Sequence, residues 1–425
     1  MEQIIIKKAI LKYDILDDIV ILDIKGSDKE KERLLNRLII HTFYLRKNII
    51  NQSGIDLSMY HFTNNLLDKN SYHIKSFVNI GDFKKGEKNN ICDVKGVSVG
   101  SATIDKGLYH TGLTIIKPHP GNIFKDKVVA SSFVFNGFGK SIGLLQIDEL
   151  GTIESPIVFS STLNIGKVCD ALVSDVLKEN AEIGESTGTF NPVVLECNDG
   201  TLSKSRDRVV GEKEYQEAKK SLSDFFLQGN VGAGCGMICH GFKGGLGSAS
   251  RVIDIQGKTY TIGVILNSNF GTSHGDDLII KGIRFKNLLN QKYEGNIDEM
   301  GSVVACVATD APLNERQLKR VLKRVEMGIA RTGSYAGNGS GDVFVAFSTT
   351  NKRKHFVKEH LDDNVYFNDN YINPIFKAVI EASEEAVLNS MFFSTSLKGY
   401  KQDVVTLAKY LKDLDNIIDE EIIWK

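Results

Sequence analysis

Three segments of the chain are nearly uninterrupted runs of apolar residues, and they limit the possible folds more than any other feature. They cover residues 260–267, 303–309 and 343–349. A strand with one face in water alternates apolar and polar residues, whereas an uninterrupted apolar strand is covered on both faces. These runs therefore predict an α+β fold with layered β-sheets enclosed by helices.

Helical spacing of apolar residues predicts the enclosing helices at 166–180, 314–331, 374–393 and 403–414. In the second of these, an apolar stripe formed by every third or fourth residue ends near Gly333, a residue suited to a left-handed helix stop. A further strand is expected at 193–196. The stripe consists of Leu318, Val321, Leu322, Val325 and Ile329.

The first 85 or so residues differ in composition from the rest of the chain, because they are rich in Ile, Lys, Asn and Asp and poor in Gly. We expect strands near residues 4–11 and 19–24 and a helix within 29–50. The polar run at 82–90 is typical of a linker. The predicted organisation is an N-terminal extension of unknown role at 1–85, followed by one main domain at 86–425.

Charge and cysteine content give no support for nucleic-acid, membrane or metal binding. The 425 residues carry 52 basic and 53 acidic side chains, so electrostatics gives no reason to expect nucleic acid or an anionic membrane as a partner. The six cysteines show no paired spacing, and Cys235 and Cys239, although followed by His240, are expected to be buried small residues rather than metal ligands. His41, His61 and His73 are expected to be surface or packing residues.

The start of the chain lacks the pattern of a secretory signal, and no window holds the roughly 18 apolar residues of a membrane span. A cytoplasmic location without membrane contact is therefore expected.

A glycine-rich stretch at 229–251 does not fit either phosphate-loop pattern, because Met237 stands where GxGxxG needs its third glycine. Its glycines are better explained by tight turns and close backbone approach around a site. Within it, Lys243 is read either as a site residue or as a surface lysine with a packed stem, with the second reading favoured.

The pair Gly301-Ser302 stands immediately before a predicted buried strand, and this placement is suited to a self-cleavage reaction. A serine there can attack the preceding carbonyl, and the resulting ester is then hydrolysed. Glycine assists because it tolerates strained dihedrals. The product is a serine with a free α-amine, whose ordinary pKa of about 8 makes it a usable base. A second Gly-Ser pair, Gly247-Ser248, is a rival on local grounds.

Other polar residues at strand ends are candidates for the same site. Ser340 and Asp342 are two apart and share a face in an extended segment. Glu196 and Asn198 follow one strand, and Asn267 and Asn269 follow another, where an amide N–H is able to donate to an oxyanion. Ordinary surface turns explain each of these pairs equally well on local grounds.

Taken together, ordered segments from residue 89 almost to the C-terminus resemble the DmpA-type aminopeptidases, a family that includes β-aminopeptidases and L-aminopeptidase/D-amidase/D-esterases. The segments that carry the resemblance are HTGLTIIKPHPGNIFKDKV (110–128), NGFGKSIGLLQIDELGTIESP (136–156), the glycine-rich stretch, NSNFG (267–271), GSVVACVATDAPL (301–313) and ARTGSYAGNGSGD (330–342).

The resemblance implies an αββα sandwich and a chain that cleaves itself between Gly301 and Ser302 into an α chain to residue 301 and a β chain of 302–425. It implies Ser302 as nucleophile, Ser340 as supporting hydroxyl and Asp342 as its acidic partner, where some members carry Glu. Asn269, with Asn267 as rival, matches the oxyanion amide. Glu196 matches the carboxylate for the substrate amine, and Asn198 stands where a member has an oxyanion tyrosine.

The expected activity is that of a serine aminopeptidase or amidase that forms an acyl-enzyme on Ser302 and needs no cofactor or metal. Small peptides, aminoacyl amides or esters are the expected substrates, and assembly as a homo-oligomer is expected from the resemblance. Two alternatives are an acyltransferase of the ornithine acetyltransferase type, a family that uses threonine as nucleophile, and a non-catalytic binding protein on the same fold.

Overall fold

The computed structural model describes residues 76–272, 275–285, 299–361 and 364–410, together with the backbone of strands at 2–6, 9–16, 19–25, 48–51, 72–75 and 421–424. The chain divides into two units. The first consists of residues 1–78 and 408–425, and the second of residues 79–407. The second unit therefore begins seven residues before the expected boundary at 86 and ends before the C-terminus, which belongs with the first unit.

In the first unit, four strands form one sheet in the order β1-β2-β3-β4, and β5 pairs with β22. The strand expected at 19–24 is present as β3, whereas the single strand expected at 4–11 is wrong, because this stretch includes parts of two antiparallel strands, β1 and β2. The helix expected within 29–50 falls outside the described residues up to 47, and its end lies in strand β4. The bounds are β1 Glu2–Ile6, β2 Ala9–Leu16, β3 Ile19–Lys25, β4 Asn48–Asn51, β5 Tyr72–Ser76 and β22 Glu421–Trp424.

The second unit is built on two sheets. The larger has six strands in the order β14-β15-β18-β19-β8-β9, in which β18 and β19 are parallel and the other pairs antiparallel. The smaller has four in the order β11-β10-β7-β6. The bounds are β6 Ser98–Lys106, β7 Tyr109–Lys117, β8 Asp126–Gly137, β9 Thr152–Ile153, β10 Ile157–Ser161, β11 Val193–Cys197, β14 Gly245–Ile255, β15 Lys258–Asn269, β18 Met300–Thr309 and β19 Gly339–Lys354.

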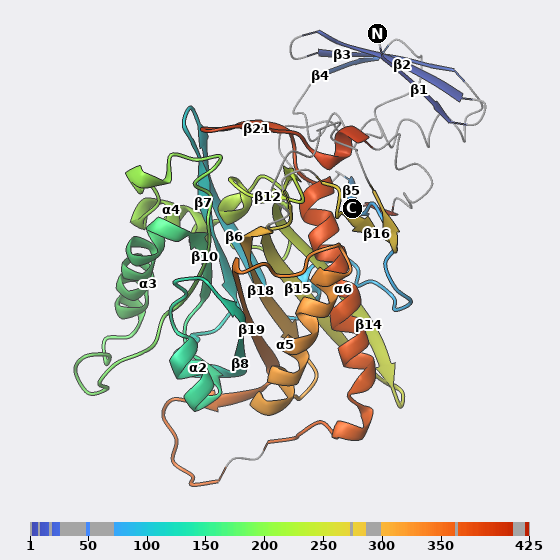
Figure 1. Cartoon of the computed structure of the whole chain (residues 1–425). Coiled ribbons are helices and arrows are strands. Elements are labelled where there is room, and N and C mark those ends of the chain that lie inside the picture. Colours follow the sequence, from blue (N-terminus) through green and yellow to red (C-terminus); the bar gives the residue numbers. More distant parts are fainter. Residues whose placement is uncertain are drawn as a thin grey trace. The chain divides into compact units, whose positions relative to one another are not determined.

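Helices cover the outer faces of the two sheets (Figure 1). α3 and α4 contact the smaller sheet, whereas α5 and α6 contact the larger one. Side chains from both inner faces form one buried core, with Phe159 and Leu195 from one sheet and Val304 and Val345 from the other. The layers are helix, sheet, sheet, helix, so the αββα prediction is confirmed. The helices are α2 Leu144–Leu150, α3 Ile165–Glu179, α4 Glu212–Lys220, α5 Glu315–Ala330 and α6 Asn373–Phe392.

Most predicted elements of the second unit are present within a few residues. The expected stripe of α5 is fully buried, and Asn314 caps its first turn by accepting a hydrogen bond from the Gln317 N–H. The helix expected at 403–414 is wrong where the chain is described, since β21 (Asp403–Val404) and a 3-10 turn (Leu407–Tyr410) stand there.

The linker expected at 82–90 is also wrong, because this segment packs into the second unit. Lys85 and Asn89 are buried, and both contact the carboxylate of Glu385 on α6, at 3.3 and 2.6 Å. Arg251 of β14, also fully buried, donates to Glu385 at 2.6 Å. Lys85 and Asn89 are therefore paired with a carboxylate far along the chain, on α6.

Short elements complete the second unit, and no helix in the described part of the chain is long and apolar enough to span a membrane. The short strands are β12 Ile238–Cys239, β13 Phe242–Lys243, β16 Ile279–Ile280, β17 Ile283–Arg284, β20 Leu397–Lys398 and β21. The other 3-10 turns are Ile91–Asp93, Thr162–Asn164, Ser205–Asp207, Gly232–Gly234 and Asp369–Tyr371.

Candidate active site

The Gly301-Ser302 pair lies at the start of β18, in the middle of the larger sheet. Gly301 has a φ of +143°, and a Cβ added there would lie 1.9 Å from the backbone oxygen of Asn269. Both the backbone conformation and the lack of room for a Cβ atom therefore favour glycine at this position. The peptide bond that follows is held between two strands, because Ser302 is paired with Asn269 of β15 and with Gly341 of β19.

The Ser302 side chain points into the space between the sheets, on the same face as Val304 and Cys306 of the buried core. Its hydroxyl is nearly buried, with 5 % of the residue exposed, and Oγ accepts a hydrogen bond from the backbone N–H of Asn198 at 3.3 Å. Cys197, the preceding residue, also lies against this hydroxyl. Burial raises the pKa of the Cys197 thiol far above its usual range, so it stays protonated.

Ser340 and Asp342 lie on the opposite face of the larger sheet from the Ser302 side chain, because side-chain direction alternates along paired strands. Ser340 is the strand partner of Gly301, which places it beside the peptide group whose nitrogen belongs to Ser302. Its hydroxyl donates to Asp342 Oδ1 at 2.6 Å. The two residues are brought together as predicted, next to the backbone of the Gly-Ser pair rather than next to the Ser302 hydroxyl.

Two further carboxyl groups, Glu299 and Glu326, surround Asp342 on this face. Glu299 accepts from the Ser334 hydroxyl at 2.5 Å and from the Tyr335 N–H at 2.7 Å, which fastens the segment before Gly301 to the loop before β19. Burial, with the added effect of Glu299, raises the pKa of Asp342 to about 6. Burial, Asp342 and Glu299 raise the pKa of Glu326 to about 8, so Glu326 is neutral at pH 7.

Sequence reasoning did not find Glu299 or Glu326. One signal was available, because Glu326 follows Leu322 by four residues and so shares the buried face of its helix.

The two asparagines of β15 face the same side of the sheet as Ser302, but only one is accessible. Asn269 is half-buried opposite Ser302, and its Oδ1 accepts from the Ile238 N–H at 3.0 Å, which leaves its Nδ2 group as a donor. Asn267 is fully buried and its Nδ2 donates to the Ala233 oxygen at 3.0 Å. Of the two candidates, the geometry favours Asn269 for contact with a reacting group.

Glu196 lies at the end of β11, just before the residues that contact Ser302. Its carboxylate accepts from the Lys140 N–H at 2.9 Å and from the Thr162 hydroxyl, and the Lys140 ammonium is 4.0 Å away. Asn198 has an exposed side chain that accepts from the Gly200 N–H at 2.9 Å, so it approaches Ser302 through its backbone rather than its amide.

Asp199, a further polar residue at the same strand end, is buried next to Asn198. Burial raises the pKa of its carboxyl to about 6, although the hydroxyls of Thr111 and Ser161 act in the opposite direction.

The glycine-rich stretch supplies close backbone contacts, as expected. Ser248, the serine of the rival pair, lies within β14 and donates to the Val264 oxygen at 2.6 Å, while a Cβ at Gly247 would lie 1.9 Å from the Ala386 oxygen of α6. Lys243 is not the surface lysine that the sequence favoured, because its side chain is fully buried. Burial lowers the pKa of Lys243 to about 8.

Cys235 and Cys239 are buried, as expected, and no group of three or more His, Cys, Asp or Glu residues in the described ranges is placed to hold a metal.

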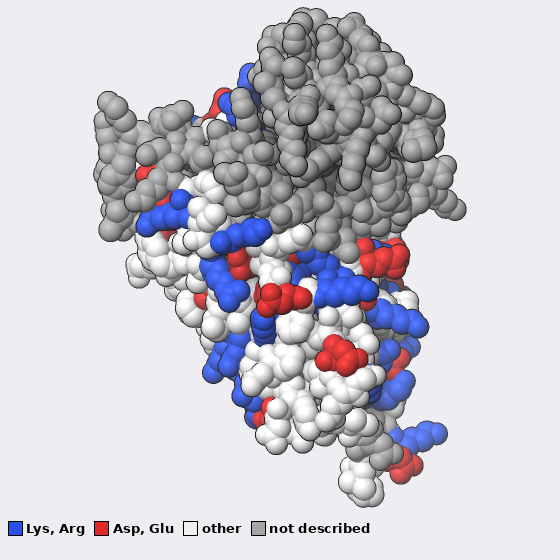
Figure 2. Space-filling model, turned by 90° about the vertical axis from the view of Figure 1, so that its right-hand side faces the viewer, with Lys and Arg blue, Asp and Glu red and all other residues white. Residues whose placement is uncertain are grey.

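Lysines and arginines are interspersed with acidic residues on the face of the molecule shown in Figure 2.

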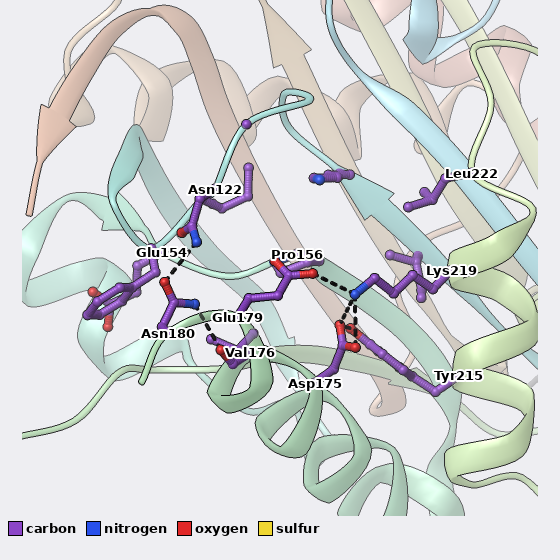
Figure 3. Close-up of a pocket in the computed structure, with 15 residues that line it drawn as sticks. Asn122, Glu154, Pro156, Asp175, Val176, Glu179, Asn180, Tyr215, Lys219 and Leu222 are labelled. Atoms are coloured by element: carbon purple, nitrogen blue, oxygen red, sulfur yellow. Dashed lines mark hydrogen bonds and ion pairs between the residues drawn. The ribbon is translucent and has the colours of Figure 1, made fainter. Parts of the chain in front are cut away.

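A separate cavity of about 40 Å³ lies between α3 and α4, on the outer side of the smaller sheet (Figure 3). Lys219 donates to Asp175 and Glu179 there, and Asn122 donates to Asn180. Lys219, Asp175 and Glu179 thus pair with one another, and none of the residues around Ser302 lines the cavity.

Solved structures share this architecture. A protein of Pyrococcus horikoshii OT3 superposes with a TM-score of 0.75 at 46% identity, covering 80% of this chain and 96% of that chain. A Burkholderia sp. beta-aminopeptidase gives 0.74 at 32% identity, with 80% and 97% covered. The L-aminopeptidase D-Ala-esterase/amidase of Ochrobactrum anthropi, described as a variant of the N-terminal-nucleophile hydrolase fold, gives 0.71 at 31% identity, with 79% and 97% covered. The protein therefore has the fold of a serine hydrolase of the N-terminal-nucleophile class.

The chain matches the model of Peptidase family S58 over residues 89–405 and belongs to that family. It is 34% identical over 340 residues to the beta-peptidyl aminopeptidase BapA of Sphingosinicella microcystinivorans, with 74% of this chain and 84% of that protein covered. The corresponding enzyme of Sphingosinicella xenopeptidilytica is 33% identical over 348 residues, with 74% and 83% covered. The protein is thus a serine aminopeptidase or amidase, and the acyltransferase and non-catalytic alternatives are not favoured.

Proposed function

We propose that the chain activates itself by cleavage between Gly301 and Ser302. The Ser302 Oγ attacks the Gly301 carbonyl carbon, the C–N bond breaks, and an ester forms while the amine of Ser302 is released. Water then hydrolyses the ester, which restores the hydroxyl and leaves a carboxylate on Gly301. The observation that carries this proposal is the φ of +143° at Gly301, directly before a nearly buried serine hydroxyl.

In the cleaved enzyme, Ser302 is the nucleophile toward the substrate carbonyl, and its own α-amine accepts the hydroxyl proton. Ser340 is the partner of that amine, since it lies beside the peptide nitrogen from which the amine forms, and Asp342 orients Ser340 by accepting a hydrogen bond from its hydroxyl at 2.6 Å. The acyl group then passes from Ser302 to water.

Two donors serve the tetrahedral oxyanion in this proposal. One is the Nδ2 group of Asn269, which faces Ser302 across the strand pair, and the other is the backbone N–H of Asn198, which already lies 3.3 Å from Oγ. Loss of one such donor costs about 3–4 kcal/mol of transition-state stabilisation in comparable sites. Asn267 contributes by packing, because it is buried and bound to a backbone oxygen.

Glu196 selects substrates with a free amine in this proposal, which makes the enzyme an exopeptidase. Its carboxylate is almost fully buried but keeps a cation within 4.0 Å, the ammonium of Lys140, which a substrate ammonium would replace. Small β- or α-aminoacyl peptides and amides are the proposed substrates, by analogy with the beta-peptidyl aminopeptidases that the chain resembles. Assembly into a homo-oligomer and a cytoplasmic location also stay proposals.

A screen of aminoacyl amides with both backbone types and both hands tests this function, using wild-type protein and Ser302→Ala. We expect wild type to release the amine from at least one class, and Ser302→Ala to release none. Glu196→Gln should raise KM for these substrates by roughly 10-fold or more, because it removes the charge that pairs with the amine. Turnover by Ser302→Ala at the wild-type rate would contradict the assignment.

A further inference from the structure

The hairpin formed by β12 and β13 has a fixed shape that depends on one tight turn. Ile238 pairs with Lys243 and Cys239 with Phe242, so only His240 and Gly241 form the connection. Both have positive φ, 48° and 76°, as in a type I′ turn. The His240 ring anchors the turn through Asp277 Oδ1 at 3.2 Å and Thr332 Oγ1 at 3.3 Å. The hairpin therefore has one register and one anchored tip.

Lys243 closes the base of this hairpin from inside the protein. Its side chain is fully buried, and Nζ donates to three backbone oxygens, those of Gly234 at 3.2 Å, Met237 at 3.0 Å and Gly244 at 2.6 Å. All three belong to the glycine-rich stretch on either side of the hairpin. This ammonium thus joins the backbone on both sides of the hairpin, and it holds the Met237 oxygen together with the Gly244 N–H, which donates to the same oxygen at 3.0 Å.

The strand that Lys243 fixes makes a direct contact with the candidate active site. The N–H of Ile238, the residue after Met237, donates to Asn269 Oδ1 at 3.0 Å. An amide group has one acceptor end and one donor end, so this bond determines which end faces the other way. With Oδ1 held by Ile238, the donor end of Asn269 is the one left for a substrate at Ser302, its strand partner.

We infer that Lys243 is a positioning residue for the oxyanion site, acting through the Ile238 N–H on the orientation of the Asn269 amide. The inference rests on the proposed function, in which Asn269 donates to the oxyanion. Lys243 itself touches neither the substrate nor Ser302, since its ammonium is enclosed by backbone oxygens.

A double-mutant cycle tests the inference in the processed enzyme, with the concentration of active sites titrated for each variant. Asn269→Ala is expected to lower kcat by roughly 10²–10³-fold. Lys243→Met should lower kcat by roughly 10–10²-fold at nearly constant KM, as a small misplacement of a catalytic group does. The double variant should lose no more than Asn269→Ala alone, because the second change acts only through the first residue.

Lys85→Met is the matched control, because Lys85 is also a buried lysine, bonded to Asn79 Oδ1 at 2.7 Å and to Glu385, away from Asn269. It should lower thermal stability and leave kcat per active site unchanged. If Lys243→Met does not fold, Lys243→Gln takes its place in the cycle, since its shorter, uncharged side chain keeps a polar group in the buried position but cannot bind all three backbone oxygens.

The outcomes separate this inference from the proposed function. Losses that multiply in the double variant would overturn the role of Lys243, and so would wild-type kcat in Lys243→Met alongside a slow Asn269→Ala. Wild-type kcat in Asn269→Ala would instead overturn the proposed oxyanion donor and, with it, this inference.

Discussion

At the scale of single residues, Ser302 combines a nearly buried hydroxyl with a preceding glycine of positive φ. Its hydroxyl is nearly buried between two sheets, yet the peptide bond before it begins at a glycine whose backbone no other residue adopts easily. The hydroxyl faces the Asn198 N–H on one side of the larger sheet, while Ser340 and Asp342 lie on the other side, next to the backbone. The Ser302 hydroxyl and the Ser340–Asp342 pair thus lie on opposite faces of the larger sheet.

Gly301→Ala should slow self-cleavage by roughly 10²-fold, because the new Cβ meets the Asn269 oxygen at 1.9 Å and displaces the scissile peptide. The rate of appearance of the 302–425 fragment measures this directly. Gly188→Ala is the control, since no atom lies within 4 Å of the Cβ it adds. Wild-type cleavage in Gly301→Ala would show that the glycine conformation has no part in the reaction.

The pKa of Asp342 predicts an acid limb in the activity profile. Burial raises this pKa to about 6, so kcat should fall as the pH drops below 6 and Ser340 loses its charged acceptor. Asp342→Asn should be slower by roughly 10²-fold and should lack this limb. An acid limb at the same pH in Asp342→Asn would refute the assignment.

Asp342 also makes the stability of the fold depend on pH, in the opposite direction to its effect on activity. The folded pKa lies above the ordinary value of 3.8, so the folded state binds the proton more tightly. The associated stability is present at low pH and is lost as the pH rises from about 4 to about 6.

At the scale of elements, α5 places the carboxyl group of Glu326 beside Asp342 of β19. Glu326 Oε2 and Asp342 Oδ2 are both buried without a hydrogen bond from the described residues. Ionisation of Glu326 beside Asp342 and Glu299 is therefore unfavourable, and its pKa of about 8 follows from burial first and from these neighbours second.

Glu326→Gln should stabilise the fold at high pH by on the order of 1–3 kcal/mol, because the glutamine never ionises. In wild type, stability is lost as the pH rises from about 4.5 to about 8, so the gain should be seen at pH 9 and be small at pH 5. Urea unfolding at both values measures it. Glu149→Gln, at an exposed position, is the control. Equal effects of the two substitutions at pH 9 would contradict the buried, neutral state of Glu326.

Elements with a clear apolar period were predictable from the sequence, and elements held by long-range polar contacts were not. The apolar stripe of α5 and the apolar runs of β15, β18 and β19 predicted burial, and these residues are buried. The segment at 82–90 has the composition of a linker, and only its pairing with Glu385, far along the chain, buries Lys85 and Asn89. The burial of Lys243 was not predicted for the same reason, since its partners are backbone oxygens, which composition does not reveal.

The candidate site was predictable in its members but not in its arrangement. The order of Ser302, Ser340 and Asp342 along the chain gave the right neighbours, whereas the strand register decides that Ser340 faces the peptide group and not the Ser302 hydroxyl. Asn198 was proposed for its amide and contacts Ser302 through its N–H instead.

At the scale of the whole second unit, cleavage at Ser302 would separate the chain but not the sheet. β18 and β19 would belong to the C-terminal fragment, while their outer neighbours β15 and β8 would belong to the N-terminal one. The two fragments should therefore elute together under native conditions and separate only in denaturant. Spontaneous separation of the fragments in native buffer would contradict the strand order.

Mass spectrometry of the purified protein, incubated at neutral pH and then denatured, tests the central claim most directly. The account predicts two species, one ending at Gly301 and one beginning at Ser302, and a Ser302→Ala chain that stays at full mass. A wild-type chain that stays intact at full mass while it hydrolyses aminoacyl amides would contradict it.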